Sequence, residues 1–344
     1  MSVVTLAVDA MGGDHGLDVT VPAVATMLSR QEHLHIILVG QPEPLATAMK
    51  NAGLEGHARI TVQPASEVVA MDDPVAVALR QKKDSSMRVA INMVKEGRAQ
   101  AAVSAGNTGA LMAVSRFVLK TLPGVDRPAI CTAIPTVSGH CHMLDLGANV
   151  DSEPEHLLQF ALMGQALVNA VDGVRHPRVA LLNIGEEDIK GNEQIKVAAG
   201  LLRDAPNIHY AGFVEGDGIF AGEADVVVCD GFVGNVSLKT MEGVAKMLKN
   251  MIREEAERSW LRKLSALLAL PVFRGLKSRM DPDRYNGASL VGLRGVVVKS
   301  HGGTTVEGFA SALLVAELEA RRNVPALIRD ALAPTGSDAD SETH

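Results

Sequence analysis

Long apolar runs are missing from this chain of 344 residues. No stretch of 18 apolar residues occurs, and the first residues do not form a basic segment followed by an apolar one. The sequence therefore predicts neither a membrane-spanning helix nor a secretory signal, and we expect a cytoplasmic protein.

Cysteines, aromatic residues and positive charge are also scarce. The three cysteines, Cys131, Cys141 and Cys229, lie far apart without zinc-site spacing, so we expect buried thiols in a reducing compartment. Aromatic residues make up only 3% of the chain, which predicts an aliphatic core. The net charge of −7 argues against nucleic acid as a partner, so any bound anion must be held by local donors.

Several cofactor and nucleophile motifs are absent. The first glycine-rich turn has neither the G-x-G-x-x-G spacing of dinucleotide sites nor the Lys-Ser/Thr of a P-loop, and no G-x-S-x-G elbow occurs. Asp9, Asp14 and His15 could ligate a divalent metal, but no other His/Asp cluster has ligand spacing that completes such a site. We therefore expect no metal and no cofactor.

Short apolar stretches alternate with helix-length amphipathic ones. The expected strands are Val3–Val8, His35–Val39, Arg59–Val62, Ala101–Ser104, Ala129–Pro135, Cys141–Asp145, Arg178–Asn183, Ile208–Phe213, Asp225–Cys229 and Gly295–Lys299. The expected helices are Asp18–Arg30, Glu43–Asn51, Ser86–Glu96, Thr108–Lys120, Pro154–Asn169, Asn192–Arg203, Asn235–Glu257 and Thr305–Arg322. This alternation is typical of a doubly wound, Rossmann-like α/β/α sandwich with a mostly parallel sheet. We expect a single domain over residues 1–332 and a disordered tail over 333–344.

Six expected strands end in polar or glycine-bearing turns. These turns are residues 9–13, 104–109, 145–149, 183–191, 230–235 and 299–303. Because parallel strands place their carboxyl ends on one sheet edge, where α/β proteins bind ligands, we expect the six turns to converge on one cleft.

The first two of these turns carry donors for an anion. Glycines at 12, 13 and 16 let backbone N–H groups approach a ligand closely, beside Asp14 and His15. Alternatively, this is a tight turn with Asp14 as a helix N-cap. The 104–109 turn opens a helix and adds hydroxyl and amide groups, and its alternative is an ordinary N-cap. The segment 80–86 is either an anion-binding loop or an exposed basic turn.

Two further turns carry candidates for catalysis. Lys190 stands just before Gly191 and the next helix, where its ammonium could point at the cleft, or could pair with the neighbouring acidic residues. Asn235 could donate a hydrogen bond to a developing oxyanion, or serve as the N-cap of the long helix that follows.

The segment Arg258–Met280 is basic and amphipathic. It holds six basic residues, no acidic one and the single tryptophan, and Pro271 ends or kinks its helix. This pattern favours an anionic membrane surface or an acidic protein partner, while a dimer-interface or core helix is the structural alternative.

These motifs together resemble the bacterial phosphate acyltransferase family, acyl-[acyl-carrier-protein]:phosphate acyltransferase. The matching segments are VDAMGGDHG at 8–16, KKDSSM at 82–87, SAGNTGA at 104–110, DLGAN at 145–149, NIGEE with KG at 183–191, GFVEG at 212–216, CDGFVGNVSLKTMEG at 229–243 and VKSHGG at 298–303. The resemblance implies transfer of a fatty acyl group from acyl carrier protein to inorganic phosphate, giving acyl phosphate for phospholipid synthesis.

The same resemblance implies the fold, the assembly and the catalytic pair. The fold would be similar to isopropylmalate dehydrogenase-like and phosphotransacetylase enzymes, in a homodimer that associates peripherally with the membrane. A membrane glycerol-3-phosphate acyltransferase would be the functional partner, and neither metal nor nucleotide would be needed. Lys190 and Asn235 would be the catalytic residues.

The candidate residues fall into two further sets. We expect phosphate or substrate binding by Asp9, Gly12, Gly13, Asp14, His15, Lys82, Ser104, Gly106, Asn107, Thr108, Asn149, Glu187, Asp230 and His301. We expect membrane or carrier-protein contact by Arg258, Trp260, Leu261, Arg262, Lys263, Leu264, Arg274 and Lys277. Two alternative functions are a nicotinamide-dependent hydroxy-acid dehydrogenase on the related fold and a non-enzymatic lipid-synthesis scaffold.

Overall fold

One mixed sheet runs through the protein. The structure, a computed structural model, describes residues 3–281 and 283–333, without the side chains of 276–280. Its eleven strands lie in the order β3-β2-β1-β4-β11-β10-β5-β6-β9-β7-β8. They are β1 (Val4–Asp9), β2 (Leu34–Gly40), β3 (Ile60–Pro64), β4 (Ala101–Ser104), β5 (Ala129–Thr136), β6 (Gly139–Leu144), β7 (Val179–Leu182), β8 (Tyr210–Val214), β9 (Val226–Val228), β10 (Ala288–Val291) and β11 (Val296–Lys299).

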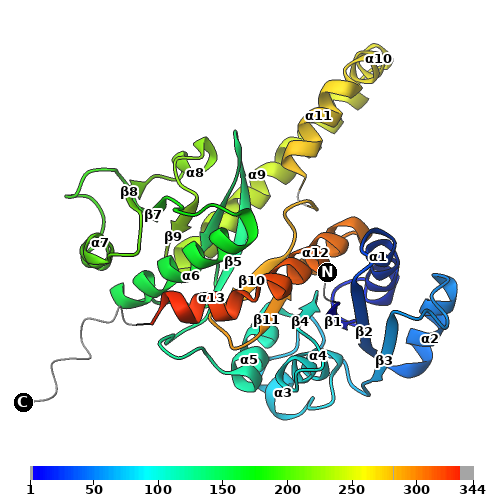
Figure 1. Ribbon diagram of the computed structural model, residues 1–344. Coiled ribbons are helices and arrows are strands. Elements are labelled where there is room, and N and C mark those ends of the chain that lie inside the picture. Colours follow the sequence, from blue (N-terminus) through cyan, green and yellow to red (C-terminus); the bar gives the residue numbers. More distant parts are fainter. Residues whose placement is uncertain (1–2, 282, 334–344) are drawn as a thin grey trace, which may run out of the picture.

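Helices cover both faces of this sheet (Figure 1). They are α1 (Leu17–Arg30), α2 (Pro42–Asn51), α3 (Val75–Arg80), α4 (Ser86–Lys95), α5 (Thr108–Leu119), α6 (Pro154–Asp172), α7 (Glu193–Asp204), α8 (Gly218–Ala221), α9 (Gly231–Glu257), α10 (Trp260–Leu268), α11 (Leu270–Met280), α12 (Val306–Arg322) and α13 (Val324–Ala331). The expected α/β/α sandwich is therefore confirmed.

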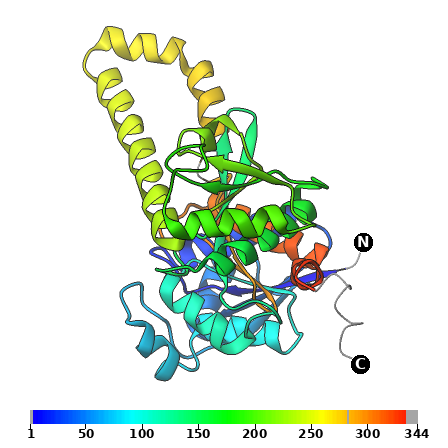
Figure 2. The ribbon, with the colours of Figure 1, turned by 90° about the vertical axis from the view of Figure 1, so that its left-hand side faces the viewer.

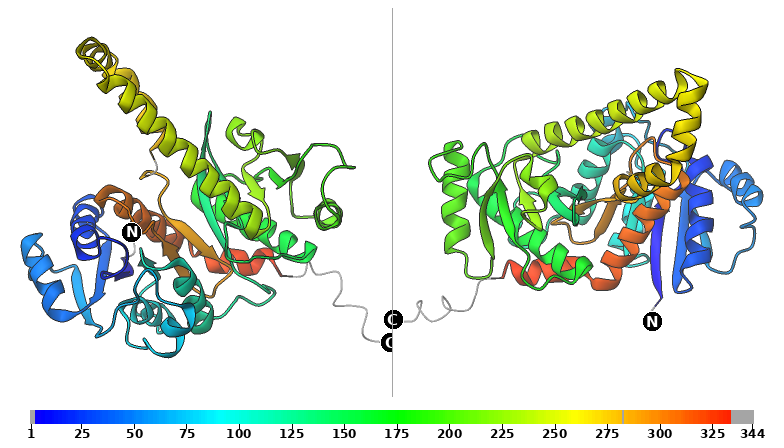
Figure 3. Two further views of the ribbon diagram at one scale, coloured as in Figure 1. Left: turned by 180° about the vertical axis from the view of Figure 1, so that it is seen from behind. Right: turned by 90° about the horizontal axis from the view of Figure 1, so that it is seen from above.

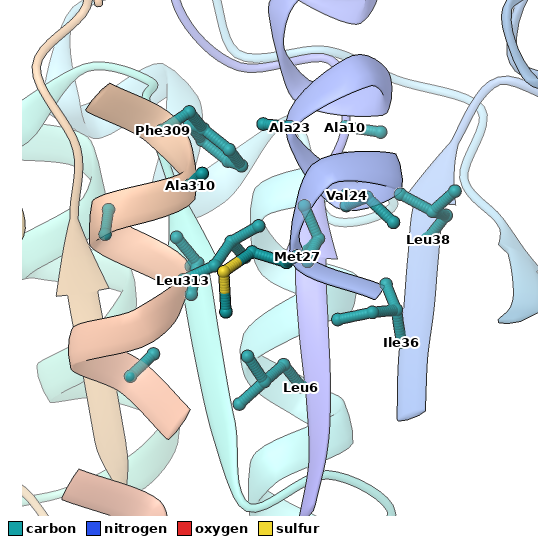
Figure 4. Close-up of a cluster of buried hydrophobic side chains, with 14 of the residues drawn as sticks. Leu6, Ala10, Ala23, Val24, Met27, Ile36, Leu38, Phe309, Ala310 and Leu313 are labelled. Carbon is teal, nitrogen blue, oxygen red and sulfur yellow. The ribbon is translucent and has the colours of Figure 1, made fainter. Parts of the chain in front are cut away.

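Alternation along the strands divides the core between the two faces. Leu6 of β1 packs with Met27 of α1 and Leu313 of α12 (Figure 4), whereas its neighbour Ala7 packs on the other face with side chains of α4 and α5. Successive strand side chains point to opposite faces, so a doubly covered sheet needs the continuous apolar runs seen in the sequence. Each large aliphatic side chain buried in this way stabilises the fold by about 1.5–3 kcal/mol.

Every expected strand and helix is present, within four residues at each end. The structure adds four elements that were not expected: α3, α8, α13 and β10. β10 has only four residues between Gly287 and Gly292, too few to show a strand period. Pro271 stands in the first turn of α11, where its missing N–H costs nothing, so it separates α10 from α11 as expected.

The strands of the two halves run in opposite directions. β11 is parallel to β4, but β10 is antiparallel to both β11 and β5, and β5 is antiparallel to β6. After these three reversals, β6, β9, β7 and β8 oppose β1 to β4 and β11. The turns after β1, β4 and β11 therefore lie at one sheet edge, and those after β6, β7 and β9 at the other. The expectation that all six turns share one edge is wrong, because it assumed no reversal at the centre of the sheet.

Three consecutive helices form an arm that projects from the body of the molecule. α9 leads away from the sheet, α10 forms the tip and α11 returns toward it (Figures 1 and 2). The two further views show the same projection (Figure 3). α9 has 27 residues, which corresponds to a length of about 40 Å. We call α9, α10 and α11 the arm.

Candidate active site

One helix, α5, brings turns from the two sheet edges together. It starts at Thr108, just past the carboxyl end of β4, and the carbonyl of Lys120 just beyond its end accepts a hydrogen bond from Arg294, next to the start of β11. A cleft of about 880 Å³ lies along it. The cleft is lined by Leu79, Thr108, Gly109, Met112, Ala113, Arg116, Phe117, Lys120, Thr121, Ile130, Leu146, Gly147, Ala148 and Asn235. The turns after β4, β6 and β9 thus share one cleft even though their strands are opposed.

The amino end of α5 opens onto this cleft with backbone donors that have no partner among the described residues. Asn107 is the N-cap, and its side-chain oxygen accepts from the Ala110 N–H at 3.0 Å. The N–H groups of Thr108 and Gly109 remain for a ligand, as the first turn of any helix leaves them. The Asn107 amide nitrogen donates to the Met71 carbonyl at 2.8 Å. Asn107 therefore caps the helix and holds the 68–73 segment, while the anion cradle stays a prediction for its neighbours.

The opening loop is tied to the 104–106 turn through a buried carboxylate. Ser104 donates to Asp9 Oδ2 at 2.6 Å. Burial raises the pKa of Asp9, although this hydrogen bond lowers it in part. A Cβ on Gly12 would come within 2.5 Å of the same oxygen and 2.9 Å of the Gly106 nitrogen. Only glycine therefore lets these two loops meet so closely. The buried Asp9 Oδ1 has no hydrogen-bond partner among the described residues.

The rest of the opening loop faces outward. Asp14 and His15 are exposed, and Gly13 has a φ of +95° that glycine adopts readily. The Asp14 N–H donates to the Gly302 carbonyl at 2.9 Å, so the first and last of the six turns touch. The N-cap of α1 is Gly16, so the alternative in which Asp14 caps this helix is wrong.

A buried lysine that the sequence analysis passed over stands between these loops. Lys299 ends β11, is 8% exposed, and donates to the Ala105 carbonyl at 3.3 Å. Burial lowers the pKa of Lys299 to about 8, although Asp14 and Asp9 favour its charged form. The available signal was its place in VKSHGG, where it ends the expected strand Gly295–Lys299 and opens the 299–303 turn, but only His301 of that turn was named as a candidate.

We expect Lys299 to make stability depend on pH. Because its folded-state pKa is about 8 against 10.5 for an exposed lysine, the unfolded state binds more protons between these values. Stability therefore increases as pH rises through this range, by up to about 3 kcal/mol. Below pH 8 both states are protonated and the cost of burying the charge is constant. Wild type should thus become more stable relative to Lys299→Met as pH rises from 8 to 10. Urea denaturation of both proteins measures their free energies of unfolding. Lys50→Met, at an exposed position, is the control, and a pH-independent Lys299→Met difference would contradict the assignment.

The turn after β6 fixes the wall opposite α5. Asp145 is fully buried and accepts from the N–H groups of Ile130, Ala148 and Asn149 at 2.8–3.0 Å. The Asn149 amide donates to the Pro128 carbonyl and to Asp145 Oδ2, both at 2.9 Å. These bonds place Gly147 against Asn235, since a Cβ there would meet the Asn235 side chain at 3.2 Å.

Asn235 lies in the second turn of α9 and lines the cleft. The N-cap of α9 is Asp230, whose side chain accepts from the Val233 N–H at 3.0 Å, so the alternative in which Asn235 caps the helix is wrong. Asp230 therefore caps α9, in addition to its predicted role in binding phosphate or substrate. Because the helix begins four residues earlier than expected, the Asn235 side chain projects from a fully formed helix.

Lys190 does not line this cleft. It is exposed on the 183–191 turn, where a Cβ on Gly185 would come within 2.8 Å of its side chain. Its backbone N–H donates to the carbonyl of Glu187, and Asp188 pairs with Arg203, so no ion pair of Lys190 with its acidic neighbours forms among the described residues. Lys190 and Asn235 are on turns at the same sheet edge, but the structure does not bring their side chains together.

Two other predicted phosphate ligands have internal partners. Lys82 donates to Asp73 at 2.5 Å and to the Val68 carbonyl at 2.8 Å. His301 Nδ1 accepts from the Gly303 N–H at 3.2 Å, and its ring is exposed. Their roles in binding remain predictions.

The three cysteines are buried, as expected. Burial raises the pKa of Cys131 and Cys229 well above the ordinary value and that of Cys141 to about 12. A thiolate is the reactive form, so burial makes these three thiols weak nucleophiles.

The sequence matches the family described as fatty acid synthesis protein over residues 4–327. A phosphate acyltransferase of Alcanivorax borkumensis is 83% identical over 98% of this chain and the whole of that protein. One of Alkalilimnicola ehrlichii is 59% identical over 94% of this chain and 95% of that protein. The chain belongs to the phosphate acyltransferase family.

It is therefore an acyltransferase, which rules out the dehydrogenase and scaffold alternatives. Solved structures agree on the fold. A phosphotransacetylase of Streptococcus pyogenes superposes with a TM-score of 0.60 at 19% identity, covering 93% of this chain and 94% of that one. A branched-chain phosphotransacylase of Enterococcus faecalis gives 0.57 at 14% identity, covering 92% and 99%.

Proposed function

We propose that the chain transfers a fatty acyl group from acyl carrier protein to inorganic phosphate, giving the acyl phosphate from which phosphatidic acid is made. The observation that carries this proposal is the single cleft onto which the amino end of α5 and the Asn235 amide both open. The first is an anion site and the second is a donor for an oxyanion. Names of the relatives support phosphate as the acceptor.

The reaction we propose is direct attack. An oxygen of hydrogen phosphate bonds to the thioester carbonyl carbon, the C–S bond breaks, and the phosphate proton ends on the carrier thiol. The protein binds both reactants in one orientation and stabilises the tetrahedral oxyanion. Asn235 donates to that oxyanion, and His15 holds phosphate or passes the proton. Lys190 neutralises the charge of phosphate or oxyanion in this proposal, which requires the 183–191 turn to move toward the cleft when the substrates bind. The burial of all three cysteines supports a reaction in which the acyl group is never bound to the enzyme as a thioester.

The rest of the cleft wall suits the acyl carrier. Apolar side chains that include Met112, Ile130 and Leu146 offer a surface for the fatty chain. Arg116 and Lys120 line the same cleft, and the Lys120 ammonium lies 5.1 Å from the Phe117 ring. These cations favour an acidic carrier protein at the mouth.

The assay that tests this function mixes the purified protein with acyl-[acyl-carrier-protein] and phosphate. Acyl phosphate is trapped as the hydroxamate, and an acyl-coenzyme A reaction serves as the control for donor choice. We expect product that depends on both carrier and phosphate. No hydroxamate with the carrier substrate, from folded protein, would overturn the proposal.

The arm, in this proposal, holds the enzyme at an anionic membrane. No helix in the described part of the chain is long and apolar enough to cross a bilayer. The tip instead exposes large apolar side chains, among them Trp260 at 72% and Leu268 at 77%, beside Lys263. Arg258 and Arg262 also lie here, each paired with Glu255, and Leu261, Leu264 and Arg274 are exposed as well. The side chain of Lys277 lies outside the described residues. Apolar and basic groups together suit a lipid surface better than water.

Charge reversal at the tip tests the membrane role. The triple variant Arg262→Glu, Lys263→Glu and Arg274→Glu should bind vesicles of phosphatidylglycerol at least about 100-fold more weakly, because each lost cation near the surface costs about 1 kcal/mol. Cosedimentation with vesicles measures it. Equal reversal at the exposed Lys50, Lys95 and Arg175 is the control. Unchanged binding of the arm variant, or an equal loss in the control, would refute the role.

A second exposed stripe, on α9, favours the proposed homodimer. It consists of Val244, Met247, Leu248, Met251 and Ile252, all at least 45% exposed. Their spacing of three and four residues is that of helix pairs, and the same stripe on a second copy would cover it under two-fold symmetry. We therefore propose that two arms pair along α9.

A further inference from the structure

Two histidines and an aspartate meet at the end of β6 that is remote from the active site. His140 Nε2 lies 3.1 Å from Asp172 Oδ1, and His142 Nε2 lies 3.0 Å from Asp172 Oδ2. The three ligand atoms are all within 4.8 Å of one another. The sequence analysis found no such set because Asp172 is 30 residues from His142.

Secondary structure builds this cluster from two rigid elements. His140 and His142 are two apart on β6, so both side chains leave the same face of the strand. Asp172 is the last residue of α6, and Gly173 follows in the left-handed conformation. The carboxyl end of a helix carries partial negative charge, which adds to the attraction of this point for a cation.

The groups around the cluster fit a cation more than they oppose it. The Asp172 carboxylate contacts both imidazoles, one through each oxygen, and so offers a negative charge to a cation held between them. On the far side of the ring, His142 Nδ1 lies 4.0 Å from the Cys131 sulfur. With Nε2 bound to a metal, Nδ1 carries the proton and faces this sulfur. Arg284 lies near His140 and opposes a cation here.

We propose that His140 Nε2, His142 Nε2 and a carboxylate oxygen of Asp172 bind one Zn²⁺, with water completing the coordination. Two imidazoles and a carboxylate are zinc ligands of ordinary type, at distances of about 2.0–2.2 Å. Ligand atoms around such an ion stand roughly 3.4 Å apart, so the present separations require only small side-chain rotations. His140 and Asp172 are partly exposed, which leaves the ion a path from solvent.

Zinc at this point would join β6 to α6 and stabilise the second half of the molecule. Asp145, at the active site, follows the opposite end of β6. We therefore assign the ion a structural role, and the acyl transfer does not need it.

Calorimetric titration of the full-length, chelator-treated protein with ZnCl₂ tests the site. We expect binding of one equivalent, together with a rise in Tm when zinc is added. His142→Gln and Asp172→Asn should each weaken zinc binding by at least about tenfold, since each removes one of three protein ligands. His35→Gln, on β2, should bind zinc like wild type and is the matched control. MgCl₂ should give no heat, because Mg²⁺ prefers oxygen ligands.

Two readouts keep folding and catalysis apart from the metal. Circular dichroism and zinc-free acyl phosphate formation should be unchanged in His142→Gln. If His142→Gln fails to fold, His140→Gln, at a more exposed position, is used in its place. Zinc binding that is absent from wild type, or that persists unchanged in the ligand variants, would overturn the proposal and leave the cluster as an internal ion pair. Failure of the acyl transfer assay would not overturn the zinc proposal, because this experiment measures metal binding and not catalysis.

Discussion

Replacement of Asn235 by alanine is expected to lower kcat by about 100- to 1,000-fold, the effect of removing one oxyanion donor from an enclosed site. The Asn235 side chain lines the cleft and is placed by Gly147 of the turn after β6. Because it acts on the tetrahedral species and not on bound phosphate, KM for phosphate should change little. Hydroxamate formation over a range of phosphate concentrations separates the two constants.

The matched control for this prediction is Asn250→Ala, an exposed asparagine farther along the same helix. It changes the same groups at a point away from the cleft, and its kcat should equal that of wild type. Lys190→Ala offers a comparison, since loss of a charge that neutralises phosphate should raise KM for phosphate as well. Near-normal kcat in a folded Asn235→Ala protein would exclude the oxyanion role.

Replacement of Gly234 by alanine is expected to destabilise the protein by about 3 kcal/mol or more, because overpacking at a rigid contact has no small adjustment available. A Cβ there would overlap the carbonyl oxygen of Asp145 and lie 2.9 Å from the Cys229 sulfur. The first turn of α9 would have to move away from the sheet. Asn235, the next residue, would move with it, so activity should fall together with Tm.

Gly243→Ala is the control in the same helix. A Cβ at Gly243 meets no atom within 4 Å. Alanine there should stabilise α9 by roughly 0.5–1 kcal/mol, since glycine is a poor helix former. Thermal unfolding of both variants measures the contrast. Equal Tm values for the two would show that α9 does not pack against Asp145 as described.

The sequence was sufficient for the alternation of elements and for the residues at strand ends. Strand and helix periods are local, so ten strands and eight helices could be placed without tertiary information. It was insufficient for strand direction, because β10 is four residues long and its antiparallel pairing with both neighbours leaves no local pattern. The prediction that six turns converge on one cleft was therefore met by only three of them, those after β4, β6 and β9. Their convergence depends on α5, which spans the sheet, and not on a common edge.

The sequence analysis also missed features of the site that depend on contacts between distant parts of the chain. Lys299 looked like part of a strand, and only its contacts with the 104–106 turn show that its charge is buried near Asp9 and Asp14. Caps were misassigned by a few residues: Gly16 and Asp230 begin the helices for which Asp14 and Asn235 were candidates. Lys190 is not among the residues that line the cleft, because the motif at 183–191 gives the residues of this turn but not the path that it takes.

The length of α9 has a consequence for where the product emerges. Asn235 and the residues next to the tip belong to one uninterrupted helix, and the 23 residues from Asn235 to Glu257 span about 33 Å. If the tip rests on a bilayer, the tilt of this helix sets the height of the cleft above the lipid. This span is about twice the thickness of one hydrocarbon leaflet, which is about 15 Å. With α9 upright, an acyl phosphate must therefore cross water before it reaches the membrane, whereas with α9 lying flat its chain can pass straight from protein to lipid.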